Sequence, residues 1–306
     1  MNWRRQGLAV TPPRTVWGET HAQLPFVAAG RPGRVYFSTR DGQGRSRVAW
    51  VDIDPTRPRS PPAAAAERPL LELGALGAFD DSGVTGSCVV EHAGRLHLYY
   101  TGWSLGVTVP FTLAIGLATS EDAGRTWSRV SEGPIVGRDT ADPYLAASPW
   151  VRVEGGRWRM WYVSGVGWRM EDGRPRHCYH IRYGESEDGI AWRRPGRVCI
   201  DFAPGEYAIA RPCVLEEGGL YRMWYCSRGP RYRIGYAESP DGLAWQRRDE
   251  AGGLEPSLEG WDSGMTAYPC VFDHGGTRYM LYNGNDYGHD GAGLAVLSED
   301  GPGRRA

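Results

Sequence analysis

The chain has 306 residues and a formal net charge of −1, so it lacks the excess of basic residues that would attract nucleic acid or an anionic membrane. It contains no apolar run of the roughly 20 residues that span a bilayer. Its first residues, MNWRRQGLAVTPPRT, lack the apolar segment of a signal peptide. We therefore expect a cytoplasmic protein with reduced cysteines and with neither nucleic acid nor membrane as a partner.

One sequence pattern recurs about every 60 residues. It begins with a segment of the type Pro-x-Val, continues with an aromatic strand of the type R-M-W-Y, and ends with a strand and turn of the type I-G-Y-A-E-S-x-D-G. In chain order, the first segment or its equivalent lies at 24–27, 87–90, 148–151, 211–214 and 268–271. The aromatic strand lies at 34–38, 96–100, 158–162, 221–225 and 279–282. Short aromatic strands repeated at a fixed spacing predict a radial array of small sheets.

We therefore predict an all-β fold, a five-bladed β-propeller with four-stranded antiparallel blades that forms a single domain over residues 1–306. The last repeat ends without the tryptophan that closes others, whereas Trp3 is followed by two arginines, as Trp192 is. Residues 2–9 are thus expected to form the outer strand of the blade built from 268–298. The N-terminal strand would then close the ring and remove exposed sheet edges.

Two further segments fit this arrangement. The segment 55–69 is rich in proline and alanine and is expected to be a loop between the first two blades. The stretch SEDAGRTW (120–127) matches the Asp-box seen in sialidases. Ser120 and Asp122 can bond turn amides, and Gly124 permits a positive φ, so we interpret it as turn chemistry and not as a catalytic signature.

An acidic residue precedes each Pro-x-Val segment or its equivalent by six or seven positions: Glu19, Asp81, Asp142, Glu206 and Asp262. Ligands of propellers usually bind where the innermost strands begin, so these acids are expected to form a ring of carboxylates around one opening. Clustered carboxylates raise one another's pKa, which places a proton donor beside a base. The alternative is that they cap turns between blades, and Asp262 in GWDSG is typical of such a turn.

Further candidates for binding a substrate lie beside the acids. His21, Arg211 and Tyr268 belong to the same strands or their approaches, and Trp103 follows an aromatic strand. Together with Glu19 and Asp262 they form the expected substrate-binding set. Arg211 is expected either to bind an anionic ligand or to pair with the carboxylate of Glu206.

The repeats, together with the strings HAQLP, FDDSG, IARPC, YRIGYAES and YMLYNGN, resemble the five-bladed propeller glycoside hydrolases of families 32, 43, 68 and 130 and uncharacterised bacterial relatives. The resemblance covers essentially the whole chain. In those families three acids from separate blades act as base or nucleophile, as modulating Asp and as Glu proton donor. The resemblance implies that Asp81 and Asp142 are base and modulator and that Glu206 is the donor. The chain departs from the pattern at Glu19, where those families place an Asp, and at Gly264, where the relatives have a Glu.

Two functions are therefore expected. The first is a glycosidase-like enzyme that acts on a carbohydrate or a glycosylated small molecule with paired carboxylates at the propeller axis. The alternative is a lapsed-hydrolase propeller that binds a sugar or catalyses a non-hydrolytic step in a bacterial biosynthetic pathway. We expect no cofactor and no metal. The one weak signal for a metal is His177-Cys178-x-His180, and because it lies in an irregular insertion we attribute the closeness of these three residues in sequence to chance. The sugar, the linkage and the oligomeric state are left open.

Overall fold

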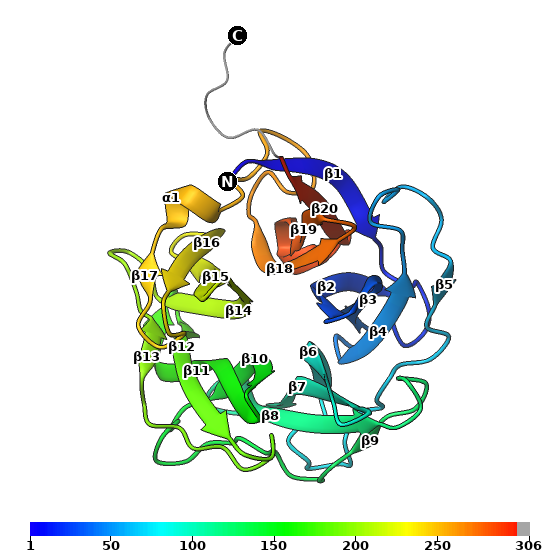
Figure 1. Cartoon of the computed structure of the whole chain (residues 1–306). Coiled ribbons are helices and arrows are strands. Elements are labelled where there is room, and N and C mark those ends of the chain that lie inside the picture. The colour runs from blue at the N-terminus through cyan, green and yellow to red at the C-terminus, as the bar shows by residue number, and fades with distance from the viewer. Residues whose placement is uncertain (299–306) are drawn as a thin grey trace.

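The computed structural model describes residues 1–298, and β-strands arranged around a central axis make up most of this part of the chain (Figure 1). Its helices are two short ones, α1 (Asp249–Gly252) and α2 (Asn285–Gly288). The prediction of an all-β fold is confirmed. In the described residues no helix is long and apolar enough to cross a membrane.

Successive strands pair antiparallel and form small sheets, called units here. From the axis outward, each unit has an innermost, a middle, a third and an outer strand. Each unit is named by its innermost strand. The innermost strands are β2 (Thr20–Ala28), β6 (Gly83–His92), β10 (Ala146–Glu154), β14 (Ala208–Glu217) and β18 (Ala267–His274). The middle strands are β3 (Arg31–Arg40), β7 (Arg95–Leu105), β11 (Arg157–Glu171), β15 (Leu220–Arg228) and β19 (Thr277–Asn283). The third strands are β4 (Ser46–Asp52), β8 (Phe111–Ser120), β12 (Arg174–Ser186), β16 (Tyr232–Ser239) and β20 (Ala292–Leu297). The outer strands are β5 (Ala64–Ala65), β9 (Ser128–Arg129), β13 (Val198–Ile200), β17 (Gln246–Arg247) and, in the β18 unit, β1 (Trp3–Val10).

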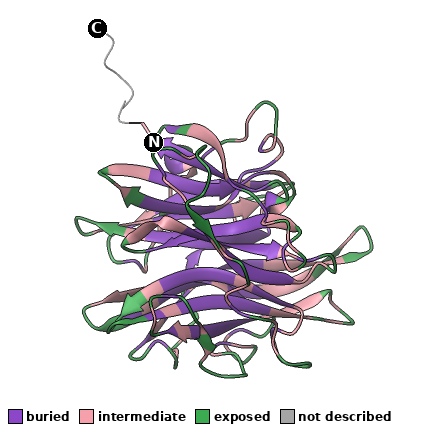
Figure 2. Cartoon of the chain, turned by 90° about the vertical axis from the view of Figure 1, so that its right-hand side faces the viewer, coloured by how far each residue is buried: buried purple, intermediate pink, exposed green. Residues whose placement is uncertain are grey.

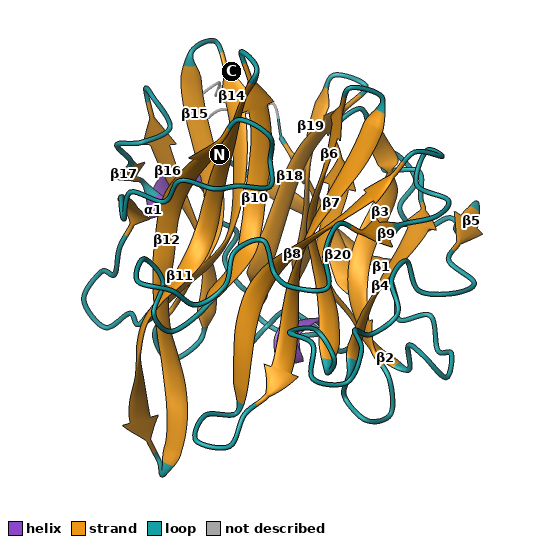
Figure 3. Ribbon diagram, turned by 90° about the horizontal axis from the view of Figure 1, so that it is seen from below, coloured by secondary structure: helices purple, strands orange, loops and turns teal. Residues whose placement is uncertain are grey.

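The end of the axis at which the innermost strands begin is called the mouth. Because each middle strand runs antiparallel to its innermost strand, its last residues and the loop that follows lie at the same end. The hairpin between β11 and β12 projects beyond the neighbouring strands (Figure 3). Neighbouring units touch near the mouth through single parallel pairs, Ser46 with Gly83 and Tyr179 with Ala208.

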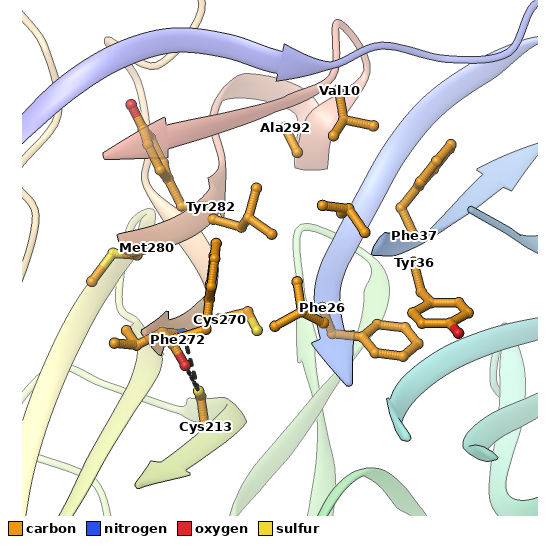
Figure 4. Packing of buried hydrophobic residues seen from close by; sticks show 14 of the residues in the cluster. Val10, Phe26, Tyr36, Phe37, Cys213, Cys270, Phe272, Met280, Tyr282 and Ala292 are labelled. Atoms are coloured by element: carbon orange, nitrogen blue, oxygen red, sulfur yellow. Dashed lines mark hydrogen bonds between the residues drawn. The ribbon is translucent and has the colours of Figure 1, made fainter. Parts of the chain in front are cut away.

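The N-terminal strand β1 is the outer strand of the β18 unit. It pairs antiparallel with β20 from Trp3 to Val10. Trp3 is 6% exposed, and its indole Nε1 donates to the carbonyl of Gly252 at 3.1 Å. Val10 lies beside Ala292 in the packed cluster of Figure 4. The predicted outer strand at 2–9 is therefore confirmed, displaced by one residue.

Aromatic side chains of the middle strands connect one unit to the next. The Tyr99 hydroxyl donates to the carbonyl of Gly189 at 2.9 Å, and the indole of Trp161 donates to the carbonyl of Gly242 at 2.8 Å. Both glycines lie in turns of the following unit, and both aromatic side chains are fully buried. Figure 2 shows that buried residues lie mainly along the strands and exposed residues mainly in the loops. The recurring aromatic residue of the middle strand is thus explained by packing between units.

The turns that follow three of the third strands have the expected side-chain bonds. The Ser120 hydroxyl donates to Asp122 at 2.8 Å and accepts the amide of Gly124 at 2.9 Å. The same bonds recur in the later turns at Ser186 with Asp188 and at Ser239 with Asp241. The interpretation of SEDAGRTW as turn chemistry is confirmed.

The segment 55–69, expected as a loop, is mostly irregular but supplies the short strand β5. This strand pairs with β4 through Val51 opposite Ala65 and Asp52 opposite Ala64. The segment therefore belongs to the β2 unit and provides its outer strand.

Each innermost strand contains a β-bulge at the start of its Pro-x-Val segment or equivalent. A bulge changes the direction of a side chain and is frequent beside functional sites. Four of the bulge residues have a positive φ: Leu24 (53°), Ser148 (46°), Arg211 (58°) and Tyr268 (55°). The backbone amides of two bulge residues are hydrogen-bonded to side chains of neighbouring units. The amide of Leu24 donates to Asn283 Oδ1 and that of Ser148 to Thr101 Oγ1, both at 2.8 Å. The bulges therefore fix these residues near the mouth.

Candidate functional site

Several carboxylates that precede the innermost strands are buried in clusters with a tyrosine and an arginine. Asp142 is 0% exposed, accepts the hydroxyl of Tyr162 at 3.0 Å, and forms an ion pair with Arg194. Asp80 likewise accepts the hydroxyl of Tyr100 at 3.1 Å and forms an ion pair with Arg129 at 2.8 Å. Asp262 accepts the hydroxyl of Tyr282 at 2.9 Å and forms an ion pair with Arg5 at 2.9 Å. The tyrosine comes from the middle strand and the arginine from the outer edge of the same unit. These carboxylates therefore point into their own units, toward the outer strands and away from the axis.

Glu206 is bound by an arginine of its own unit. Arg247 donates to it from Nη1 at 2.7 Å and from Nη2 at 2.9 Å, and the amide of Ala203 donates at 2.7 Å. Burial favours a higher pKa for Glu206, but the bonds from Arg247 and Ala203 hold the pKa below its ordinary value. The expectation of a donor kept protonated by nearby negative charge is wrong, because the neighbouring charge is positive.

The two remaining acids have simpler surroundings. Asp81 accepts the amide of Gly77 at 3.0 Å and the hydroxyl of Ser82 at 2.8 Å, so it caps the turn that precedes β6. Glu19 is exposed, and its carboxylate forms no hydrogen bond with another residue in 1–298. The turn-capping alternative thus describes Asp81.

Asp81, Asp142 and Glu206 are each bound separately, and the expected ring of carboxylates around one opening stays a prediction. Within residues 1–298, no hydrogen bond or ion pair joins any two of Asp81, Asp142 and Glu206. Each acid is engaged by its own turn or its own unit, where amides, hydroxyls and guanidinium groups stabilise its charge.

The mouth instead carries a group of aromatic residues, called here the tyrosine cluster: Tyr179, Tyr207, Tyr232, Tyr268 and Tyr287. The ring of Tyr232 lies 5.8 Å from that of Tyr268 and 6.2 Å from that of Tyr287, between ring centroids. Tyr268 and Tyr287 stack with centroids 6.5 Å apart and an interplanar angle of 26°. The hydroxyls of Tyr179 and Tyr232 are hydrogen-bonded to each other. Tyr268, expected to bind substrate, is therefore one of several rings that can do so.

Arg228, the last residue of β15, packs against this cluster. Its guanidinium carbon lies 5.2 Å from the ring centroid of Tyr232, 5.6 Å from that of Tyr207 and 6.0 Å from that of Tyr287. A cavity of about 390 Å³ opens beside it, within the range of small-molecule sites. The cavity is lined by residues of the β15–β16 turn, the loop before β18, and α2, including Arg228, Tyr232 and Tyr287.

His21 lies on the other side of the mouth, near Arg40. Its ring packs edge-on against His289 at 5.3 Å, and its Nδ1 is 2.9 Å from the Thr20 hydroxyl. Burial, followed by the charges of Arg40 and His289, lowers the pKa of His21 to about 4. His21 is therefore a neutral hydrogen-bonding group at physiological pH.

Arg40 connects His21 with the tyrosine cluster. It is half-buried, and its Nε donates to Gln23 Oε1 at 3.1 Å. Burial lowers the pKa of Arg40, and the nearby hydroxyls of Tyr268 and Tyr287 act against that effect. The structure thus brings His21 and Tyr268 to one region of the mouth near Arg40, and their role in substrate binding stays a prediction.

The other expected substrate-binding residues lie apart from this region or within the protein. Arg211 is 1% exposed, and its Nη2 donates to the carbonyls of Leu24 at 3.3 Å and Pro25 at 3.4 Å. It is not the partner of Glu206, because Arg247 has that place. The indole of Trp103 donates to Ser46 Oγ at 2.8 Å. Asp262 is enclosed in its cluster with Tyr282 and Arg5.

The His177-Cys178-x-His180 segment does not gather metal ligands. The ring of His177 stacks on Tyr179 with centroids 4.8 Å apart, whereas His180 Nδ1 lies 3.2 Å from Asp201 Oδ1. In the described part of the chain, no group of three or more His, Cys, Asp or Glu side chains could hold a metal ion.

Comparisons with known proteins give close sequence relatives and distant structural ones. No family model matches the chain. "Uncharacterized protein MT1551" of Mycobacterium tuberculosis is 44% identical over 301 residues, which are 97% of this chain and 99% of that protein. "Uncharacterized protein Rv1502" of the same species shows the same identity and coverage.

Solved structures of low sequence identity share the whole architecture. A structure described as "Glycoside hydrolase" superposes with a TM-score of 0.72 and 18% identity over 99% of this chain and 93% of that protein. A thermostable family-43 glycoside hydrolase gives a TM-score of 0.66 and 16% identity over 95% of this chain and 93% of that protein. An endo-arabinase from Bacteroides thetaiotaomicron gives a TM-score of 0.65 and 13% identity over 95% of this chain and 98% of that protein. These likenesses establish the fold of the β-propeller glycoside hydrolases.

Proposed function

The chain is a member of the same family as Uncharacterized protein MT1551 of Mycobacterium tuberculosis and has the fold of the β-propeller glycoside hydrolases, and we propose that it binds a carbohydrate or a glycosylated small molecule at the mouth. The observation that carries the proposal is the tyrosine cluster, of which Tyr232 and Tyr287 line the cavity. This is the lapsed-hydrolase alternative.

Tyrosines suit such a ligand because each offers an apolar face and a polar edge. The ring face of half-buried Tyr287 can pack against the C–H face of a sugar and its hydroxyl can bond to the sugar's hydroxyl groups, whereas Tyr232 is 3% exposed and supports Tyr287 by packing against its ring. Both residues line the cavity. Their rings already pack against Tyr268 and Arg228, so little side-chain entropy is lost when the ligand binds.

The architecture proposed with this function counts each unit as one blade. The protein would then be a five-bladed propeller in one domain over residues 1–306, with β1 closing the ring through its pairing with β20. Ring closure leaves no open sheet edge beside the ligand site.

The competing function is a glycosidase with Asp81, Asp142 and Glu206 as its catalytic groups. It draws support from the fold it shares with glycoside hydrolases. In the site as described, Asp142 and Glu206 would first have to leave Arg194 and Arg247.

Binding is tested by isothermal titration with a panel of neutral oligosaccharides. We expect at least one to bind the intact protein, and the Tyr287→Leu variant to bind it about tenfold or more weakly because it lacks a stacking ring. Tyr221→Leu is the matched control, since this half-buried tyrosine lies at the far end of β15. A panel with no binder, or equal affinity in the Tyr287 variant, contradicts the proposal.

Turnover is tested on the same oligosaccharides by the release of reducing ends. We expect the intact protein to release no reducing ends above background. Turnover that disappears in Glu206→Gln, while the melting curve of that variant shows that it is folded at the assay temperature, would establish the glycosidase function instead.

A further inference from the structure

Arginines without a carboxylate partner gather on one side of the mouth. Within residues 1–298, Arg228 forms no ion pair, and neither do Arg231 and Arg233, both of which donate to the carbonyl of Gly264 at 3.4 and 3.2 Å. Other arginines of the β14 and β18 units bind carboxylates: Arg222, Arg247 and Arg278. Positive charge is therefore left uncompensated around this cavity.

Arg228 is held in a defined position with its N–H groups unused. Three tyrosine rings pack around its guanidinium at 5.2 to 6.0 Å, and its Nε is buried without a hydrogen-bond partner. A buried donor without an acceptor is costly, so such groups usually meet one in the functional state. Aromatic packing engages the face of a guanidinium and leaves its edge available for two parallel bonds to a carboxylate or a phosphate.

The cavity beside Arg228 has a composition suited to an anion. Its charged lining residues are Arg228, Arg231 and Asp286, which gives two positive charges and one negative charge, or a net +1. Asp286 is exposed to solvent, whereas Ser263 and Asn285 add neutral hydrogen-bonding groups. Its volume of about 390 Å³ accommodates a ligand of monosaccharide size.

Arg40 adds a second positive charge in the neighbourhood of Tyr287. Its only side-chain hydrogen bond to a described residue goes to the neutral Gln23. Tyr287 lies near both arginines, at 6.0 Å from the guanidinium carbon of Arg228 and within the electrostatic range of Arg40. A ligand stacked on Tyr287 would therefore be exposed to the positive charge of both arginines.

We propose that the ligand carries a carboxylate or phosphate group that Arg228 binds through its free N–H groups, with Arg231 beside it and the sugar ring against Tyr287. The inference rests on the carbohydrate-binding function proposed above and specifies the charge of the ligand. Both acidic groups present paired oxygen acceptors to a guanidinium, which is the geometry that arginine favours.

The test measures the affinities of the full-length protein for D-galactose, D-galacturonate, D-galactose 6-phosphate and inorganic phosphate by ligand-observed NMR. We expect at least one charged sugar to bind about tenfold or more tightly than galactose, as a charge-assisted pair of bonds provides. The preferred acid distinguishes a carboxylate ligand from a phosphate ligand. This preference should weaken as NaCl is added.

Variants assign the preference to Arg228. Arg228→Met should abolish the preference for the charged sugar over galactose, and Arg228→Lys should retain part of that preference. The control variant Arg157→Met, at the far end of β11, should leave the preference unchanged. Melting curves establish that each variant is folded. If Arg228→Met does not fold, the lysine variant and the salt dependence decide the result.

The outcomes separate this inference from the proposed function. Equal binding of galactose and both charged sugars overturns the inference and leaves carbohydrate binding intact. Binding of galactose 6-phosphate no tighter than that of inorganic phosphate upholds the anion site and contradicts the carbohydrate function. Absence of binding by all four probes contradicts both.

Discussion

Arg247 binds Glu206 with both of its terminal nitrogens, Nη1 to Oε2 at 2.7 Å and Nη2 to Oε1 at 2.9 Å. Two parallel bonds of this kind make the strongest contact between a guanidinium and a carboxylate. Arg247 also binds Asp249 at 2.7 Å, and Asp249 accepts the hydroxyl of Tyr225 at 2.6 Å. The residue expected to donate a proton thus belongs to a charged network that joins strands of the β14 unit.

Replacing Glu206 by Gln should lower the free energy of unfolding at pH 7 by about 1–3 kcal/mol, since one charge-assisted contact is lost. The pKa of Glu206 is lower in the folded state than in the unfolded state. Its contribution is therefore present above the unfolded pKa of about 4.3 and is lost as the pH falls through the folded value. Denaturant unfolding of both proteins from pH 7 to pH 3 should show a difference that shrinks toward low pH. Equal stability at pH 7 would remove Glu206 from the network.

Replacing Tyr162 by Phe should destabilise the protein by about 1–3 kcal/mol, because buried Asp142 loses a hydrogen-bond donor. Tyr36→Phe is the matched control. Tyr36 is equally buried on its own middle strand, but its hydroxyl has no partner among the described residues. Urea unfolding should therefore place Tyr36→Phe at or slightly above the parent protein. A similar loss in both variants would show that the Asp–Tyr–Arg clusters add no stability.

Deleting residues 1–10 should cost several kcal/mol, since burial of a large side chain such as Trp3 alone is worth roughly 1.5–3 kcal/mol. The deletion also removes the pairing with β20 and the bond from Arg5 to Asp262. Arg4→Ala, a change at an exposed position of the same strand, serves as the control. A truncated protein that melts at the temperature of the full chain would contradict the role given to β1.

His177 should make the protein less stable in mild acid. Burial, followed by the charges of Arg228 and Arg176, lowers the pKa of His177 to about 4. Its contribution is complete above the unfolded pKa of about 6.5 and is lost as the pH falls to about 4, with a maximum of roughly 3 kcal/mol. His177→Asn should therefore lose less stability than the parent protein between pH 6.5 and pH 4, measured by urea unfolding. Parallel curves would show that His177 is solvated.

The repeat spacing predicts the strands, the S-x-D-G turns and the outer strand β1, because each depends on residues close in sequence or on a pattern that recurs. The likeness of Trp3 to Trp192 predicts the strand β1, although Trp3 is 6% exposed and Trp192 is only partly buried. What the spacing determines is which residues share a position in the unit. It does not determine which way their side chains point.

The carboxylates illustrate that limit. Asp80, Asp142 and Asp262 lie seven positions before the proline of the repeated segment, or before the serine that replaces it, whereas Asp81 and Glu206 lie six positions before it. Side chains alternate in direction along extended chain, so the two offsets are not equivalent. A tyrosine twenty residues after each member of the first group was the available signal of a structural cluster.

Arg40 and Arg228 are the last residues of β3 and β15 and occupy equivalent positions of the repeat, but the sequence does not show that Tyr287 of α2 lies beside both of them. Their proximity depends on the bulges and on α2, in which Asp286 and Tyr287 have φ values of 50° and 58°. Such left-handed residues are set by tertiary contacts more than by local propensity. The candidate site therefore combines two equivalent positions of the repeat, Arg40 and Arg228, with Tyr287 of α2, which lies outside the repeated strands.

The pairing of Trp3 with Leu297 also has a consequence for biosynthesis. The strand β1 leaves the ribosome before β20, the strand it pairs with, which is translated almost three hundred residues later. Until then, the indole of Trp3 and the backbone of β1 have no native partner, and an unpaired strand is prone to aggregate. A stalled ribosome would therefore present a nascent polypeptide that chaperones and proteases can recognise, and only complete translation would remove that signal.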